Sequence, residues 1–246
     1  MNASLSQIDF SRIQVVSYDL GYTLLGINAP VIARLVEEHL HLSFTPAQVL
    51  RADQELRLQY LHRHIMNTRV QHSHFSAVLC DMIAYLSPEI VTSTPESQIR
   101  NFELACRKHH NDHNFFDQIY HDAFAALEAL RLAKKRIIAI SNAHGTLERD
   151  LTKFGMIEYF ERILDSTVEG VVKPNPEIFI RAADRCGVPA EAILHIGDNY
   201  SADVEGARAV GMQSALYDPN NMYKNFGKNI PSFRNHMDIV DLLLAS

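Results

Sequence analysis

Hydrophobic and polar positions follow two distinct patterns along this chain. Short β-branched and aliphatic runs each stop at a polar or glycine-containing segment, and stretches with apolar residues at helical spacing separate them. These runs predict strands at residues 13–18, 136–140, 162–164, 192–196 and 213–217. The spacing predicts helices at residues 121–133, 146–154, 176–186 and 202–210, and a closing helix at 237–245. Alternating strands and helices predict an α/β fold, a Rossmann-like parallel-sheet core covered on both faces.

A purely helical pattern occupies the stretch from residue 26 to residue 117. Its predicted helices span residues 29–40, 46–66, 70–86 and 95–109, with no convincing strand between them. This stretch is too long for a crossover and too regular for a loop. We therefore predict an α-helical domain at 26–117, inserted into a core made of residues 1–25 and 118–246.

Four polar segments fall at the ends of predicted strands. Ligands bind at the carboxyl ends of the strands in open parallel sheets, so we expect these segments to share one crevice. They read YDLGYTL at 18–24, ISN at 140–142, KPNPEIF at 173–179 and HIGDNYSADVEGAR at 195–208.

The acidic residues of these segments predict a metal site. Asp19, Asp198 and Asp203 would place three carboxylates beside one cation, Lys173. Two like charges about 4 Å apart repel by about 4 kcal/mol at an effective dielectric of about 20, so the cluster needs a divalent ion or raised pKa values. Oxygen ligands suit Mg²⁺, and a carboxylate beside Mg²⁺ is a suitable nucleophile for phosphorus. Lys173, the Ser141 hydroxyl and backbone N–H groups can neutralise phosphoryl oxygens.

The order and spacing of these segments resemble those of the haloacid dehalogenase-like hydrolases, in the helical-cap (C1) subgroup. The similarity covers nearly the whole chain, although the cap matches only in position, size and helicity. KPNPEIF and GDNYSADVEGARAVGM are its most specific parts. The resemblance implies a Mg²⁺-dependent phosphatase that acts on a small phosphorylated metabolite through an aspartyl-phosphate. It also implies that the cap closes over the site and selects the substrate.

The resemblance implies roles for the residues at the centre of the site. Asp19 would be the nucleophile and a metal ligand. The carbonyl of Gly21 and the carboxylate of Asp198 would be the other protein ligands of the metal. Ser141 and Lys173 would hold the phosphoryl group.

Four further residues have supporting roles by the same resemblance. Thr23 would support the first loop and, with Asn142, bind the substrate. Asp203 and Asn199 would orient the site. Asp203, Asn142 and Asn199 each have a purely structural alternative, because short polar side chains also cap helices and stabilise turns.

Gly21 departs from the family pattern. Phosphatases of this family usually carry a second Asp at this position, which protonates the leaving group and later activates water. The metal ligand there is a main-chain carbonyl, so metal binding survives the change. General acid–base catalysis is typically worth about 10²–10⁴-fold, which predicts slow turnover, a substrate with a good leaving group or proton transfer assisted by the substrate. Tyr22 is a poor replacement, because a tyrosine pKa of about 10 does not suit the task.

Three other functions stay open or are disfavoured. Gly21 could mark a protein that binds a phosphorylated ligand or a partner without turnover. A 2-haloacid dehalogenase also lacks the second Asp, but usually lacks an acidic ligand where Asp198 stands and needs a cap arginine, for which Arg34 or Arg51 could serve. A phosphonate-cleaving relative needs a cap lysine for a Schiff base, and no lysine precedes Lys108.

Composition limits the partners. The 246 residues carry a net charge of −6, and no run of Lys or Arg forms a basic patch, which argues against nucleic acid. No apolar run reaches membrane-spanning length, and residues 1–14 lack the pattern of a signal peptide. The three cysteines are far apart in sequence, as expected for reduced thiols. We therefore predict a cytoplasmic protein with a small phosphorylated substrate; the oligomeric state stays open.

The 13 histidines raise the question of a second metal site. His109 and His113 would share one face of a helix at i, i+4 spacing. Two further pairs, His62/His64 and His72/His74, are spaced by two residues. No cysteine or carboxylate lies at a spacing that completes a convincing site, so we favour a solvated polar face of the inserted domain.

Overall fold

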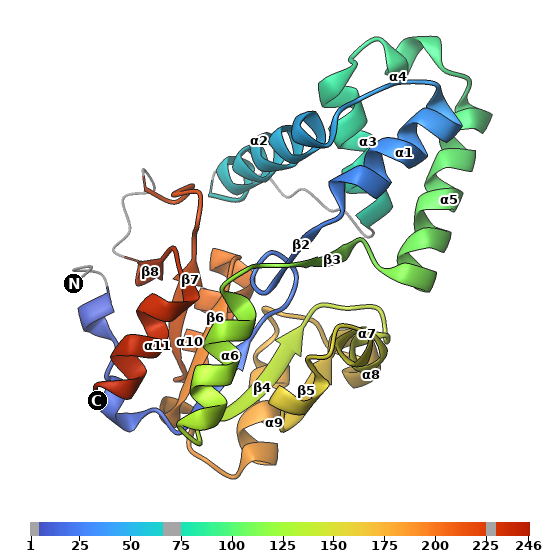
Figure 1. The fold of residues 1–246 in the computed structure, drawn as a ribbon. Coiled ribbons are helices and arrows are strands. Elements are labelled where there is room, and N and C mark those ends of the chain that lie inside the picture. The colour runs from blue at the N-terminus through green and yellow to red at the C-terminus, as the bar shows by residue number, and fades with distance from the viewer. Residues whose placement is uncertain (1–4, 66–74, 225–229) are drawn as a thin grey trace. The chain divides into compact units, whose positions relative to one another are not determined.

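The structure is a computed structural model that describes residues 5–65, 75–224 and 230–246; it does not describe the side chains of residues 62–65, 75–77 and 91–92. The chain forms two compact units, Met1–Gly26 with Phe116–Ser246 and Ile27–Phe115. The first unit contains a six-stranded sheet, and the second contains helices α1 to α5 (Figure 1). The domain boundaries at 26 and 117 stay a prediction.

The sheet of the first unit is parallel in every pair, and its strand order is β5-β4-β1-β6-β7-β8. This confirms the α/β, Rossmann-like class. The order reverses at β1, because β4 and β5 extend to one side of it and β6 to β8 to the other. Ligands of such sheets bind at this switch point, outside the carboxyl ends of the strands. The strands are β1 Val15–Tyr18, β4 Arg136–Ser141, β5 Arg162–Asp165, β6 Ile193–Gly197, β7 Gln213–Tyr217 and β8 Ser232–Phe233.

Helices cover both faces of the sheet because side chains alternate along each strand. In β1, Val16 and Tyr18 join the core that includes α6, α7 and α11, whereas Val15 joins the core that includes α9 and α10. Aliphatic and aromatic side chains make up most of both cores, as expected for a parallel sheet. The helices are α6 Ala123–Leu132, α7 Leu147–Lys153, α9 Pro176–Cys186, α10 Gly206–Arg208 and α11 His236–Leu244.

The structure adds short elements that the sequence pattern does not reveal. Two strands, β2 Leu25–Ile27 and β3 Phe116–Ile119, pair into a small second sheet where a helix-only stretch was expected. Strands this short hold too few residues to display a period of two. The expected helix at 202–210 is instead a π-helical turn, Tyr200–Glu205, followed by α10. Other described elements that were not expected are β8, α4 Ile90–Ser93, α8 Ser166–Glu169 and the 3-10 turns at Leu5–Gln7, Phe10–Arg12, Ile157–Tyr159 and Ala190–Ala192.

The second unit is helical, as its sequence pattern predicts. The Asn28 side chain caps α1 by accepting a hydrogen bond from the Val31 N–H at 3.1 Å, and α1 ends at His41 in the left-handed conformation. The expected helix ends at residues 66 and 70–74 lie outside the described residues. The helices are α1 Ala29–Leu40, α2 Pro46–Ile65, α3 Phe75–Leu86, α4 Ile90–Ser93 and α5 Glu96–His113.

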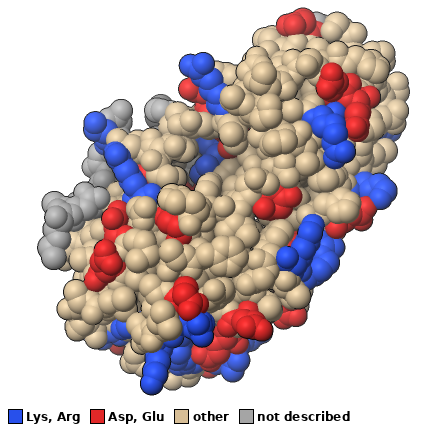
Figure 2. Space-filling model, in the orientation of Figure 1, with Lys and Arg blue, Asp and Glu red and all other residues tan. Residues whose placement is uncertain are grey.

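Charged side chains of both signs are scattered over the face drawn in Figure 2. Among the described helices, none combines the length and the apolar character needed to cross a bilayer.

The histidine in α11 predicts how stability depends on pH. His236 is fully buried, its Nε2 lies 2.8 Å from the Thr23 carbonyl oxygen, and its backbone N–H donates to Asp122. Burial lowers the pKa of His236 below its ordinary value of 6.5, so the unfolded chain binds a proton that the folded protein does not. This contribution is therefore present above pH 6.5 and is lost as pH falls below it.

Replacing His236 with Phe keeps an aromatic ring on Tyr217, against which the imidazole stacks at 4.2 Å, but removes the titration. Between pH of about 7.5 and about 5.5, the unfolding free energy of His236→Phe should fall less steeply than that of wild type, by up to about 1.4 kcal/mol per pH unit. Urea titrations at several pH values measure both slopes. Equal slopes would contradict the assignment.

Candidate functional site

The loop after β1 presents Asp19 at the end of the central strand. The Asp19 N–H donates to the Ile196 carbonyl at 2.8 Å, which continues the sheet ladder one residue beyond β1. The chain then closes on the carbonyl of Leu20, which accepts hydrogen bonds from the N–H groups of Leu24 and Leu25, both at 2.9 Å. A tight turn therefore follows the carboxylate immediately and fixes its position.

The Lys173 ammonium is the electrostatic centre of the site. It is 4% exposed and donates to Asp19 Oδ1, to Asp203 Oδ1 and to the carbonyl of Ile140, each at 2.7 Å. The Ser141 hydroxyl donates to the same Asp19 oxygen at 2.9 Å. All three N–H donors of Lys173 are thus occupied, so a phosphoryl group could contact this ammonium only by replacing one of these acceptors.

Asp19 keeps one oxygen for other chemistry. Its Oδ1 receives both the ammonium and the hydroxyl, whereas Oδ2 accepts no hydrogen bond from the described residues. Oδ2 is therefore available to a cation or to an electrophile.

Asp203 is held by donors on both carboxylate oxygens. Oδ1 contacts Lys173 and lies 3.3 Å from His195 Nε2, and Oδ2 accepts from the Asn199 N–H at 2.9 Å. The π-helical turn turns the side chain back toward β6, where it lies against Gly197. A Cβ atom at residue 197 would lie 2.2 Å from the Asp203 carboxyl carbon, so only glycine fits there. The close packing against Asp203 therefore explains why residue 197 is a glycine.

His195 is a site residue to which the sequence reasoning assigned no role. It lies in β6 with no exposed surface, between Ser17 and Asp203. Burial lowers the pKa of its imidazole, which is neutral as a result. A neutral ring can donate to the Asp203 carboxylate only through Nε2–H, so Nδ1 accepts from the Ser17 hydroxyl, 2.9 Å away. The sequence does offer one indication of such a role, since His195 is a polar residue inside the predicted apolar strand at 192–196.

Burial and neighbouring charges act in opposite directions on the pKa values of Asp203, Lys173 and Asp19. Burial alone would raise the pKa of Asp203, but the Lys173 ammonium and the His195 hydrogen bond outweigh it and hold that pKa well below its ordinary value. For Lys173 burial lowers the pKa, and the two carboxylates more than reverse this. For Asp19 burial dominates and raises the pKa despite Lys173, with a further rise from the Asp203 charge. These directions favour the ionised forms of Lys173 and Asp203 and disfavour the ionised form of Asp19.

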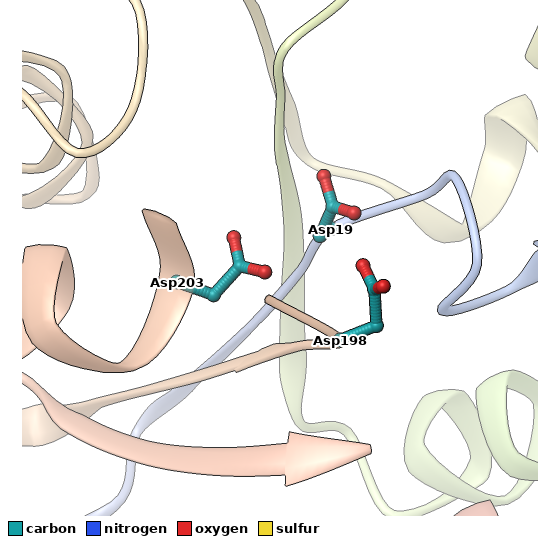
Figure 3. A group of neighbouring side chains, drawn as sticks. All are labelled: Asp19, Asp198 and Asp203. Carbon is teal, nitrogen blue, oxygen red and sulfur yellow. The ribbon is translucent and has the colours of Figure 1, made fainter. Parts of the chain in front are cut away.

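The aspartate cluster fits a cation. Asp19, Asp198 and Asp203 each offer one carboxylate oxygen, and these oxygens lie within 4.8 Å of one another (Figure 3). Because both oxygens of Asp203 already have donors, Asp19 and part-buried Asp198 are the better ligands. Oxygen donors beside a single ammonium favour a hard divalent ion such as Mg²⁺.

The Asn142 side chain forms hydrogen bonds with the backbone of Lys173. Its amide nitrogen donates to the Lys173 carbonyl at 3.0 Å, and its amide oxygen accepts from the Lys173 N–H at 2.8 Å. The Asn142 side chain thus pairs with both the carbonyl and the N–H of Lys173. This arrangement favours a positioning role over the substrate contact expected from the sequence.

The environments of Thr23 and Asn199 favour structural roles for both side chains. The Thr23 side chain is fully buried, and its hydroxyl has no hydrogen-bond partner among the described residues, which favours support of the loop over the predicted contact with the substrate. The Asn199 side chain caps the π-helical turn by accepting from the Ala202 N–H at 2.9 Å. Gly21 lies in the turn after Asp19, and the metal contact of its carbonyl stays a prediction.

The histidines of α5 interact with aromatic rings. The His109 and His113 rings lie 5.0 Å apart, and His109 also packs on Phe115 at 4.8 Å. Within the described part of the chain, the group of His, Cys, Asp and Glu residues with metal-binding spacing is the aspartate cluster. The side chains of His62 and His64, and all of His72 and His74, lie outside the described residues.

The sequence of this chain matches the haloacid dehalogenase-like hydrolase family over residues 27–211. It is 32% identical over 218 residues to 5-amino-6-(5-phospho-D-ribitylamino)uracil phosphatase YigB of Escherichia coli K12, covering 85% of each chain. It is 32% identical over 136 residues to haloacid dehalogenase-like hydrolase domain-containing protein 3 of Mus musculus, covering 52% of this chain and 54% of that protein. The match thus spans about half the length of the vertebrate relatives. The chain belongs to the haloacid dehalogenase-like hydrolases.

Solved structures share the fold. HAD-hydrolase YfnB from Bacillus subtilis, described as bound to magnesium, superposes with a TM-score of 0.64 at 20% identity and covers 95% of this chain and 99% of its own. A 2-haloacid dehalogenase from Pseudomonas syringae superposes with a TM-score of 0.55 at 21% identity, covering 95% and 98%. At this identity the likeness shows the fold alone.

The close approach of Asp203 to Gly197 predicts unequal effects of alanine at two glycines. Gly197→Ala should lower the free energy of unfolding by about 1–3 kcal/mol, because the new methyl group must displace the buried side chain of Asp203. Gly21→Ala is the matched control, since its Cβ would meet the Phe116 ring at 3.4 Å, an ordinary contact. Denaturant unfolding of both variants measures the difference, and equal losses would contradict this packing argument.

Proposed function

We propose that this hydrolase is a Mg²⁺-dependent phosphomonoesterase that transfers the phosphoryl group of a small metabolite to Asp19. The observation that carries the proposal is the environment of Asp19: one carboxylate oxygen bound by Lys173 and Ser141, the other without a donor among the described residues, and Asp198 beside it. The printed name of the Escherichia coli relative, a phosphatase of a phosphorylated ribitylaminouracil, supports the reaction class.

The chain's own residues account for the two chemical steps. Asp19 attacks phosphorus, the bond to the leaving oxygen breaks, and the phosphoryl group becomes an acyl phosphate on the carboxylate. Water then attacks phosphorus, releasing inorganic phosphate and the free carboxylate. Lys173 and Ser141 orient Asp19 and donate to the charge that shifts among the oxygens.

The metal would be held by Asp19, Asp198 and the Gly21 carbonyl. When bound, Mg²⁺ supplies the positive charge that lets an anionic carboxylate approach an anionic phosphate. Asp203 keeps Lys173 charged and in place, and therefore acts through the lysine.

Proton transfer to the leaving group is the weak point of the proposed site, since Gly21 supplies no acid. A leaving group that departs as a stable anion avoids this deficit, whereas an alkoxide does not. We therefore propose that the chain hydrolyses aryl or other activated phosphates faster than simple alkyl phosphates.

Replacing the nucleophile tests the reaction. Asp19→Asn should lower Mg²⁺-dependent hydrolysis of p-nitrophenyl phosphate by more than about a thousandfold, because an amide cannot attack phosphorus. Asp184→Asn, at an exposed position of α9, should leave the rate unchanged. Release of p-nitrophenolate measures both, with EDTA as the metal-free arm. Wild type that hydrolyses nothing with any divalent ion would indicate a protein that only binds its phosphorylated ligand.

An acidic side chain introduced at residue 21 tests whether the lack of a general acid limits the rate. Packing allows a side chain at residue 21, so Gly21→Asp should raise kcat on an alkyl phosphate such as glycerol 2-phosphate, by up to about 10²–10⁴-fold. It should change p-nitrophenyl phosphate hydrolysis much less. Gly21→Asn has the same size without the acid and should give no gain. Wild-type turnover of alkyl phosphates at about ten per second or more would contradict the deficit.

A further inference from the structure

A tyrosine distant in sequence from the recognised segments contacts the loop that carries Asp198. The Tyr223 hydroxyl donates to the Asp198 carbonyl at 3.1 Å and accepts from the Tyr200 N–H at 3.2 Å. One side-chain oxygen therefore bridges two backbone groups, two residues apart, in the segment between β6 and the π-helical turn.

The position of Tyr223 is itself fixed. Asp218 follows β7 and is buried, with one carboxylate oxygen accepting from the Met222 N–H at 2.7 Å and the other from the Tyr223 N–H at 3.0 Å. The Asp218 N–H donates to the Phe233 carbonyl at 2.8 Å, which ties the turn to the edge strand β8. The hydrogen bonds of Asp218 thus hold the turn from which the Tyr223 hydroxyl reaches the Asp198 loop.

The contact is a polar one that adds to apolar packing. Tyr200 and Tyr223 pack against the small apolar cluster of Val204, Leu216 and Ile230, which would remain after loss of the hydroxyl. The hydroxyl constrains the backbone on either side of Asn199, and Asp198 starts this constrained stretch. A backbone held at its carbonyl limits the directions in which the Asp198 side chain can point.

We propose that Tyr223 is a positioning residue for the divalent-cation site, acting through the backbone of Asp198. This inference rests on the proposed function, in which Asp198 is a ligand of Mg²⁺. The hydroxyl touches neither the cation nor the substrate. It preorganises the ligand loop, so its loss weakens cation binding and leaves the chemical step intact once the cation is bound.

The test is calorimetric titration of Mg²⁺ into wild type and Tyr223→Phe. The dissociation constant should rise about tenfold in Tyr223→Phe, the lower end of the range for residues that orient metal ligands, since the contact is with the main chain. Asp218→Asn should raise it in the same direction, because it weakens the turn that holds Tyr223. The control is Tyr85→Phe, which removes an exposed hydroxyl in α3 and should bind Mg²⁺ like wild type.

A second measurement separates positioning from folding. Denaturant unfolding without Mg²⁺ should show only a small loss of stability in Tyr223→Phe, as expected for two lost hydrogen bonds. At saturating Mg²⁺, kcat should be retained while the Mg²⁺ concentration for half-maximal rate rises. If wild type binds Mg²⁺ and Tyr223→Phe binds it equally well, the positioning role is wrong while the proposed function stands. Wild type that does not bind Mg²⁺ would overturn both.

Discussion

One buried ammonium sets the arrangement of the site. Lys173 has three oxygen acceptors at 2.7 Å and almost no contact with solvent, so each carboxylate satisfies one N–H donor of a buried charge. Losing one partner of a buried ion pair typically costs about 3–5 kcal/mol. The position of Lys173 in turn depends on Asn142, whose amide pairs with its backbone, and on Asp203, which His195 and the Asn199 N–H hold. The geometry of Asp19 therefore depends on Asn142, His195 and Asp203 through their contacts with Lys173 and with one another.

The sequence predicts those parts of the molecule that repeat or cluster. The strands and helices of the core have clear periods, and β7 and α9 match their expected bounds. Asp19, Ser141, Lys173, Asp198 and Asp203 could be grouped in advance because each follows a strand or belongs to a distinctive segment, and the structure brings these five together; their catalytic roles stay predictions.

Other parts could not be predicted, for identifiable physical reasons. The β2–β3 pair is too short to show a period, and the apolar spacing at 202–210 does not distinguish a π-helical turn from an α-helix. His195 and Tyr223 act through contacts that only the folded chain creates, since Ser17 is 178 residues from His195 and Tyr223 is 25 from Asp198. Nothing local to either residue signals its partner.

The place of β1 in the sheet has a consequence for synthesis. Its neighbours are β4 and β6, so Val15 pairs with Arg136 on one side and with Ile193 on the other. A growing chain that has just emerged with Asp19 therefore has an unpaired strand, and the neighbours that complete the sheet around it are made more than a hundred residues later. During that interval Asp19 is an ordinary exposed carboxylate. Asp19 gains its buried surroundings only when Lys173 and β6 arrive, which ties the onset of any activity to the near-completion of the core.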